Sequence, residues 1–285
     1  MSKKPKNAAA WFELARLEFQ RNGKTHEFDS AQKAIERAVK VAPDDARYHR
    51  WAGHIAAYNG ILKARSKNRS EMVEQLKKSA TAMERAVTLD PDDHEARTHL
   101  VSLYDNNPPE LGGDQIRAKH HVEALEKRSP VDGAVARCSF SLENEPEKKL
   151  ALWNDLAQKL GKDPRVHENL AREYALGGNV EKATVHADKA LALDPTRGKI
   201  LLDLTLAFGL KRKLEPAEHF ARRYLALDPP GPISLRAWTH MVLGRIQQMG
   251  GNKEASAESL KKARELDPYC WFTMSPPPEQ LFEAP

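Results

Sequence analysis

The sequence predicts an all-α fold in which pairs of helices are repeated along the chain, and three observations support this. One phrase is written five times with small changes, as ERAVKVAPDD, ERAVTLDPDD, DKALALDPTR, RRYLALDPPG and KKARELDPYC. The prolines taken as markers of the phrase lie at intervals of 48, 39, 34, 31, 34 and 39 residues; they are Pro43, Pro91, Pro130, Pro164, Pro195, Pro229 and Pro268. No part of the sequence supports long-range β pairing.

The recurring phrase combines the end of one helix with the beginning of the next. The residue before a proline is disfavoured in the helical region, so a helix stops there. The proline ring then fits the first turn of a new helix, where its missing N–H is not needed. Asp or Thr beside the proline can cap the free amides of that turn. The intervals therefore count helix pairs.

The stretch from Pro164 to Arg197 carries the most complete pattern. Counting Pro164 as position 1, the pattern residues are Leu170 at 7, Ala171 at 8, Tyr174 at 11, Gly178 at 15, Ala183 at 20, Ala187 at 24, Ala190 at 27 and Pro195 at 32. These residues and the period near 34 resemble the tetratricopeptide repeat. The resemblance implies a right-handed α-solenoid of about seven helix pairs, in which each pair is stabilised by stacking on its neighbours.

The proline markers divide the chain into seven expected repeats and a tail. The repeats are expected at about 8–45, 46–93, 94–132, 133–163, 164–197, 198–231 and 232–268, and the Pro-rich tail at 269–285. The fourth repeat is degenerate, because Phe140 stands where the pattern has a small residue.

The second repeat is the longest, and its extra residues predict longer helices on both sides of 66–70. Shared evenly, the excess adds about seven residues, or about 10 Å, to each helix. We expect a hairpin with a basic tip made of Lys63, Arg65, Lys67 and Arg69. The long repeat with its HRWAG helix, followed by the loop NNPPELGGD, resembles a subset of bacterial tetratricopeptide proteins. Over about residues 30–130 it also resembles the regulators of microtubule dynamics, which implies no catalytic residues.

Composition places the chain among soluble proteins. Hydrophobic residues make up 40% and charged residues 30% of the 285 residues, and the formal net charge is +5. Residues 1–90 hold 18 Lys and Arg against 11 Asp and Glu, so the basic end is N-terminal. We expect no membrane span. Without a leader-like apolar run the expected location is cytoplasmic, or periplasmic if a leader has been removed. Cys138 and Cys270 are expected to be packing thiols.

Sequence motifs give no support for catalysis, a cofactor or a metal. The stretch NGKT lacks the upstream glycine of a phosphate-binding loop, because Glu18 stands there. In HEARTH, His94 and His99 are five residues apart, which places them on different faces of one helix. No two histidines are three or four residues apart, so no local zinc site is expected. The sequence therefore predicts a non-catalytic protein–protein interaction scaffold.

The resemblance implies that positions 2, 5, 9 and 12 of the first helices line a concave groove. These positions place Phe12, Arg16 and Phe19 in the first repeat, and Arg47, Arg50, His54 and Ala57 in the second. They also place Glu95, Thr98, Ser102 and Asp105 in the third repeat, and Arg165, Glu168, Arg172 and Ala175 in the fifth. We expect the basic and aromatic members to bind an acidic or extended peptide, or a C-terminal carboxylate.

Other interpretations remain open at this level. The arginines could be solvated or could pair with neighbouring carboxylates. Nucleic acid or another anionic surface could bind the basic N-terminal repeats and the hairpin tip, with a steep loss of affinity as salt rises. The scaffold could equally serve an enzyme complex whose catalytic subunit is a separate chain. The repeats do not hold the Lys, Asn and Arg set of the family's carboxylate clamp, so a chaperone-tail adaptor is not expected.

The end of the chain raises a separate question. The tail YCWFTMSPPPEQLFEAP contains four prolines and cannot be helical throughout. It could fold back as a cap over the last helix pair or stay loose. An uncapped end of a solenoid exposes apolar surface and favours a homodimer.

Overall fold

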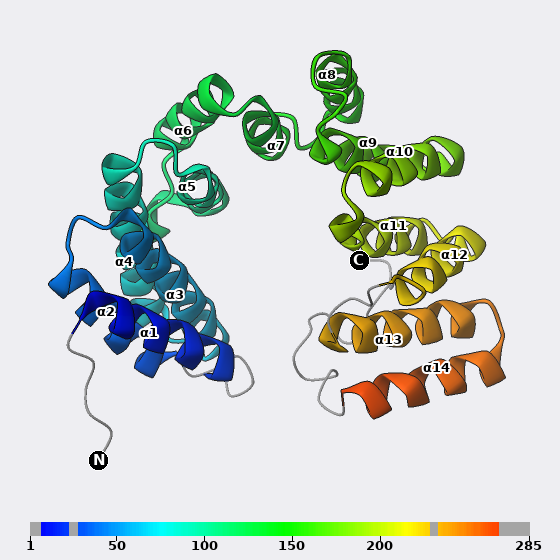
Figure 1. Cartoon of the computed structure of the whole chain (residues 1–285), viewed down its shortest axis with the longest axis horizontal. Helices are drawn as coiled ribbons and strands as arrows, with labels where there is room; N and C mark the ends of the chain where they lie inside the picture. Colours follow the sequence, from blue (N-terminus) through cyan, green and yellow to red (C-terminus); the bar gives the residue numbers. More distant parts are fainter. Residues whose placement is uncertain (1–6, 23–27, 229–232, 268–285) are drawn as a thin grey trace. The chain divides into compact units, whose positions relative to one another are not determined.

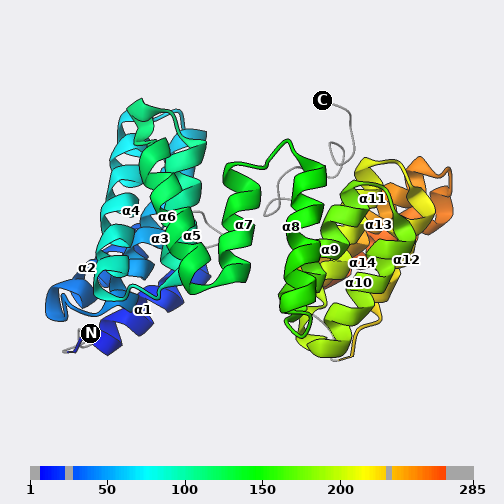
Figure 2. The ribbon, with the colours of Figure 1, turned by 90° about the horizontal axis from the view of Figure 1, so that it is seen from above.

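The computed structural model describes residues 7–22, 28–228 and 233–267, with no side-chain description for 20–22 and 65. In these residues it contains fourteen α-helices, two short 3₁₀ helices and no strand, which confirms the all-α prediction. The chain forms two compact units, Met1–Glu143 and Asn144–Pro285 (Figures 1 and 2). None of the described helices is long and apolar enough to cross a membrane. The tail lies outside the described residues.

The described part of unit 1 contains seven α-helices. They are α1 (Ala8–Asn22), α2 (Asp29–Val41), α3 (Ala46–Arg65), α4 (Arg69–Leu89), α5 (His94–Asn106), α6 (Gln115–Arg128) and α7 (Pro130–Phe140), with the 3₁₀ helix η1 (Pro109–Leu111) between α5 and α6. Helices α1 and α2, α3 and α4, and α5 and α6 pack as pairs, and α7 packs on α5 and α6. Unit 1 is therefore a stack of helix pairs with one additional helix.

Unit 2 also contains seven α-helices. They are α8 (Pro146–Lys159), α9 (Pro164–Leu176), α10 (Val180–Leu193), α11 (Lys199–Leu210), α12 (Leu214–Leu225), α13 (Ile233–Met249) and α14 (Lys253–Leu266), with η2 (Pro195–Arg197) before α11. Helix α8 packs on α9, and the pairs α9–α10, α11–α12 and α13–α14 follow. The boundary between the compact units thus falls inside the expected fourth repeat, 133–163. The division into seven repeats stays a prediction.

Polar caps begin many of the helices, at the places where the sequence changes from one helix to the next. Among the described α-helices, seven begin with an Asp or Asn whose side chain accepts a backbone N–H; these caps are Asp45, Asn68, Asp93, Asp114, Asp163, Asn179 and Asn252. For example, Asp93 Oδ1 accepts the N–H of Ala96 at 3.0 Å. Such caps satisfy amides that have no partner inside the helix.

Helices α3 and α4 form the long hairpin that the sequence predicts. They have 20 and 21 residues, against 15 and 13 for α1 and α2. The turn between them contains Lys67 with a positive φ of 58°. The additional residues of the second repeat therefore lengthen its two helices.

The contact between α6 and α7 depends on Gly133. A Cβ added at Gly133 would lie 2.5 Å from the Cα of Glu126, which belongs to the backbone of α6. We expect Gly133→Ala to lower the free energy of unfolding by about 1–3 kcal/mol, because the two helices must move apart. Urea denaturation followed by circular dichroism measures this, and Ser139→Ala on the exposed side of α7 is the control. An unchanged midpoint for Gly133→Ala would contradict the close approach.

Candidate functional site

Helices α3, α5 and α7 of unit 1 share one pocket, which we call the histidine pocket. Its volume is about 480 Å³, and α3, α5 and α7 line it with His54, His94, Glu95, Thr98, His99, Ser102 and Asp132. Four of these residues, His54, Glu95, Thr98 and Ser102, come from positions that the resemblance assigns to the groove. The other three were not expected there.

Polar contacts between helices hold the walls of the histidine pocket. His54 Nε2 on α3 lies 3.0 Å from Glu95 Oε1 on α5, and the rings of His54 and His99 meet edge to face at 5.3 Å. His99 Nε2 lies 3.0 Å from Ser79 Oγ on α4. His94 Nδ1 on α5 lies 3.3 Å from Asp132 Oδ2 on α7. The pocket is therefore built from tertiary pairs rather than from a motif on one helix.

Two of the imidazoles are uncharged at neutral pH. Burial lowers the pKa of His54, although Glu95 beside it acts in the opposite direction. Burial, together with the neighbouring His54, lowers the pKa of His99 to about 4. The cost of placing a charge in a poorly solvated site explains both shifts. Glu95 and Asp132 give the lining two negative charges, and no Lys or Arg belongs to it among the described residues.

One arginine stands beside the pocket. Arg50 on α3 donates to Asp93 Oδ1 at 3.0 Å and lies 3.4 Å from Glu95 Oε2. Asp93 is also the cap of α5, so the guanidinium joins α3 to the beginning of α5. No group of three His, Cys, Asp or Glu side chains in the described part of the chain is placed to hold a metal ion.

The two groove phenylalanines belong to an aromatic cluster. Phe12 lies 5.0 Å from the ring of Tyr48 and 5.8 Å from that of Trp51. Phe19 lies 4.8 Å from Phe28 and 5.9 Å from Trp51. Both rings are half-buried and fix α1 against α2 and α3. Their first role is packing.

Each of the other groove arginines has a carboxylate partner in the same unit. In unit 1, Arg16 pairs with Glu13 at 3.1 Å and Arg47 pairs with Asp45 at 2.7 Å. In unit 2, Arg165 pairs with Asp163 at 2.7 Å, and Arg172 pairs with Asp203 at 2.6 Å. This is the arrangement of the alternative in which the arginines pair with neighbouring carboxylates. Their positive charge is compensated inside the chain.

The predicted tip of the long hairpin contains one internal ion pair. Lys63 Nζ lies 2.7 Å from Glu71 Oε2. Lys67 is in the turn, and Arg69 is the exposed first residue of α4. The side chain of Arg65 lies outside the described residues. Glu71 thus offsets part of the positive charge of the tip.

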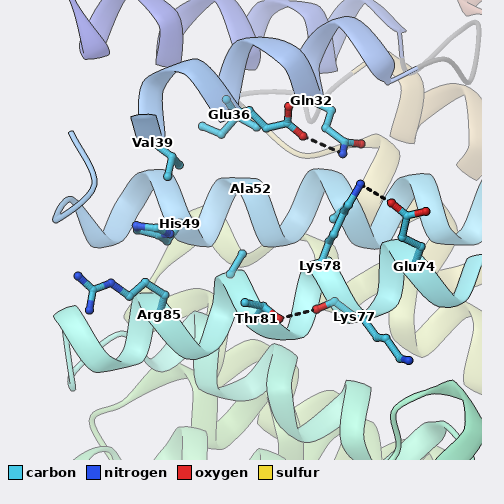
Figure 3. Close-up of a pocket in the computed structure, with 13 residues that line it drawn as sticks. Gln32, Glu36, Val39, His49, Ala52, Glu74, Lys77, Lys78, Thr81 and Arg85 are labelled. Atoms are coloured by element: carbon cyan, nitrogen blue, oxygen red, sulfur yellow. Dashed lines mark hydrogen bonds and ion pairs between the residues drawn. The ribbon is translucent and has the colours of Figure 1, made fainter. Parts of the chain in front are cut away.

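A second cavity in unit 1 was not found from the sequence. It has a volume of about 680 Å³ and lies where α2 and α4 flank α3 (Figure 3). Its apolar lining includes Ile35, Val39, Ala52 and Ala56. Paired polar side chains lie along both edges, where Gln32 donates to Glu36 and Lys78 pairs with Glu74 (Figure 3). The cavity depends on how far α2 and α4 diverge, which no local pattern encodes.

A comparison with protein families places a match on unit 1. The family described as TRAP transporter T-component matches residues 6–141, which is just under half of the chain. The matched stretch ends two residues before the end of unit 1 at Glu143. No curated protein matches the chain.

Solved structures resemble the chain over most of its length. A human IFIT1 dimer with m7Gppp-AAAA is 17% identical, with a TM-score of 0.55, and the match covers 92% of this chain and 60% of IFIT1. The chain thus spans about three fifths of IFIT1. A tetratricopeptide repeat protein from Parabacteroides merdae is 14% identical, with a TM-score of 0.46 and coverage of 92% and 94%. PilW, a type IV pilus biogenesis factor, is 16% identical, with a TM-score of 0.45 and coverage of 93% and 96%.

The recurring sequence phrase and the stacked helix pairs together support one assignment of the fold. The marker prolines recur at a period near 34. Each phrase that lies wholly in the described residues joins the end of one helix to the beginning of the next. The IFIT1 likeness extends over nine tenths of the chain with the same kind of fold. The chain therefore has a fold of the tetratricopeptide repeat type.

Proposed function

We propose that the chain is a non-catalytic binding scaffold, and that unit 1 holds an extended segment of a partner protein against the face formed by α3, α5 and α7. The histidine pocket is the observation that supports this. Helices α3, α5 and α7 contribute to it, and its lining offers hydrogen-bonding side chains, such as Thr98 and Ser102, at one face. Such faces bind peptides through contacts spread over several repeats.

The family match suggests what kind of protein the partner is. Because the T-component match coincides with unit 1, we infer that the partner is another component of a transporter. A transporter component also favours the periplasmic alternative over the cytoplasm. The homodimer expected from the sequence depends on 269–285, outside the described residues, and forms no part of this proposal.

The proposed partner segment need not be acidic, although the sequence led us to expect an acidic or extended peptide. Arg16, Arg47 and Arg50 are each paired with a carboxylate, so they present little uncompensated positive charge to a ligand. An extended segment without an acidic requirement fits the face better.

Nucleic-acid binding is not favoured by a specific contact in this chain. IFIT1 was solved with a capped RNA. In this chain, however, Lys63 at the hairpin tip is paired with Glu71, and the groove arginines are paired as well. A steep loss of nucleic-acid affinity with salt would be the sign of that alternative.

A substitution that fills the face tests the proposal. Ser102 lines the pocket and is exposed, and Ser234 on α13 is an exposed serine in unit 2. We expect the full-length wild type and Ser234→Trp to recover a transporter component from cross-linked native cells, and Ser102→Trp to lose it at least about tenfold. Circular dichroism checks that both variants stay helical. Equal recovery by Ser102→Trp would reject this face, and recovery of no transporter component by the wild type would reject the partner.

A further inference from the structure

We propose that the histidine pocket binds a cationic side chain, an arginine or a lysine of the docked segment. This inference rests on the proposed function and names the chemistry that the pocket selects. It reverses the charge of the ligand that the sequence pattern suggested for the groove. Three steps lead to it.

The first step is the charge balance of the pocket. Among the charged residues that line it, Glu95 is on α5 and Asp132 is on α7, so two carboxylates face one cavity from different helices. Arg50 beside the pocket contacts both Asp93 and Glu95, so this group of three residues keeps one net negative charge, and Asp132 adds a second. With two carboxylates and no lysine or arginine in the described lining, the pocket attracts a cation and repels an anion.

The second step is the state of the imidazoles. His54 and His99 are uncharged at neutral pH, because burial lowers the pKa of both. Their rings meet edge to face at 5.3 Å, and the ring of Trp51 lies 6.5 Å from that of His54. Neutral rings do not oppose a cation, and they supply polarisable surface for the planar face of a guanidinium.

The third step is the accessibility of the carboxylates. The side chain of Glu95 is 61% exposed although it already contacts His54 and Arg50. Arg50 shows how a guanidinium meets this carboxylate, since one of its nitrogens lies 3.4 Å from Glu95 Oε2. The side chain of Asp132 on α7 is 27% exposed, with His94 beside it, and its Oδ2 also accepts the hydroxyl of Ser129. A side chain that enters the cavity of about 480 Å³ can therefore reach carboxylates from two helices.

The test uses small blocked amino acids, so it needs no partner. N-acetyl-arginine N-methylamide, its uncharged citrulline analogue and its glutamate analogue are titrated into the full-length protein at pH 7.4. Binding is followed by the NMR signals of the His54 and His99 imidazoles, assigned with His54→Gln and His99→Gln. We expect saturable shifts with the arginine compound, and binding at least about tenfold weaker for the citrulline and glutamate compounds.

Two isosteric variants complete the test. Glu95→Gln and Asp132→Asn should each weaken binding of the arginine compound by about tenfold, whereas Glu110→Gln, an exposed acid on η1 outside the pocket, should leave it unchanged. Equal binding of the arginine and citrulline compounds, tighter binding of the glutamate compound, or no shift with any of them would overturn the proposal. Partner capture by wild type and Ser102→Trp is a separate result, so failure of the cation proposal and failure of the proposed function can be told apart.

Discussion

Replacing Phe208 with alanine is expected to lower the free energy of unfolding of unit 2 by about 3–5 kcal/mol. Phe208 on α11 is fully buried, and its ring stacks on that of Phe220 on α12 at 5.7 Å with an interplanar angle of 10°. Helix α11 packs on both α9 and α12, and Phe208 belongs to the hydrophobic cluster to which these helices contribute. Alanine would leave a cavity that the surrounding helices can close only in part.

Urea denaturation, followed by circular dichroism and by hydrogen exchange of peptides from each helix, measures this effect. Loss of protection should centre on α9, α11 and α12, because helix pairs in a stacked array are stabilised by their neighbours. Leu210 on the same helix is 63% exposed, and Leu210→Ala is therefore the matched control. Equal shifts for the two variants would show that Phe208 does not anchor the unit.

Glu84→Ala should lower the free energy of unfolding of unit 1 by about 3 kcal/mol, because it removes a hydrogen-bond acceptor on α4 that joins this helix to α5 and α6. Glu84 Oε1 on α4 accepts the hydroxyl of Tyr104 on α5 at 2.7 Å and a guanidinium N–H of Arg117 on α6 at 2.6 Å. His121 Nε2, also on α6, lies 3.2 Å from the same oxygen. Tyr104 and His121 are buried, so the substitution leaves polar groups without their partner.

The effect of Glu84 should depend on pH in a defined direction. Burial alone would raise the pKa of Glu84, but hydrogen bonds from His121 and Tyr104 and the charge of Arg117 lower it from 4.5 to about 2. Because the pKa in the folded state is below that in the unfolded state, the stabilisation is complete above about pH 4.5 and is lost as the pH falls toward 2. The difference between wild type and Glu84→Gln should therefore be constant from pH 7 to 5 and shrink at pH 3.

Urea midpoints at these three pH values provide the measurement. Glu74→Ala on the same helix serves as a control, because Glu74 forms only an exposed pair with Lys78 and should cost less than about 1 kcal/mol. A difference between wild type and Glu84→Gln that grew as the pH fell would contradict the assigned role of the carboxylate.

The fold could be read from the sequence because its signals are local. Asp90-Pro91 and Asp194-Pro195 directly follow the last residues of α4 and α10, and caps such as Asp163 act on amides two or three residues away. The long hairpin was predictable for the same reason, since 14 residues beyond the period of 34 must be placed somewhere in the 48-residue second repeat. The degenerate fourth repeat gave a weaker signal. Phe140, in the place of a small residue, packs on a cluster of unit 1 that includes Val101 and Val122.

The candidate site could be read only in part. Repeat register placed His54, Glu95 and Ser102 on one face, and the structure brings them to one pocket. Register did not reveal His99, because its contacts come from α3 and α4. Nor could it reveal that Arg50 is compensated by Asp93, which lies 43 residues further along the chain. The net charge of a surface therefore cannot be counted from a short stretch of sequence when the residue that neutralises a charge lies far along the chain.

The helix caps bear on whether a whole helix pair can be inserted into such a chain or removed from it. Asn68 and Asn179 stand in the loops that precede the helices they cap, so each of these helices carries its own start signal. A helix pair copied or excised as one cassette would therefore keep its amides satisfied, and only the apolar faces at the two new joints would have to match. Chimaeras that exchange a single cassette should fold when those faces agree, because each exchanged pair brings its own helix caps with it.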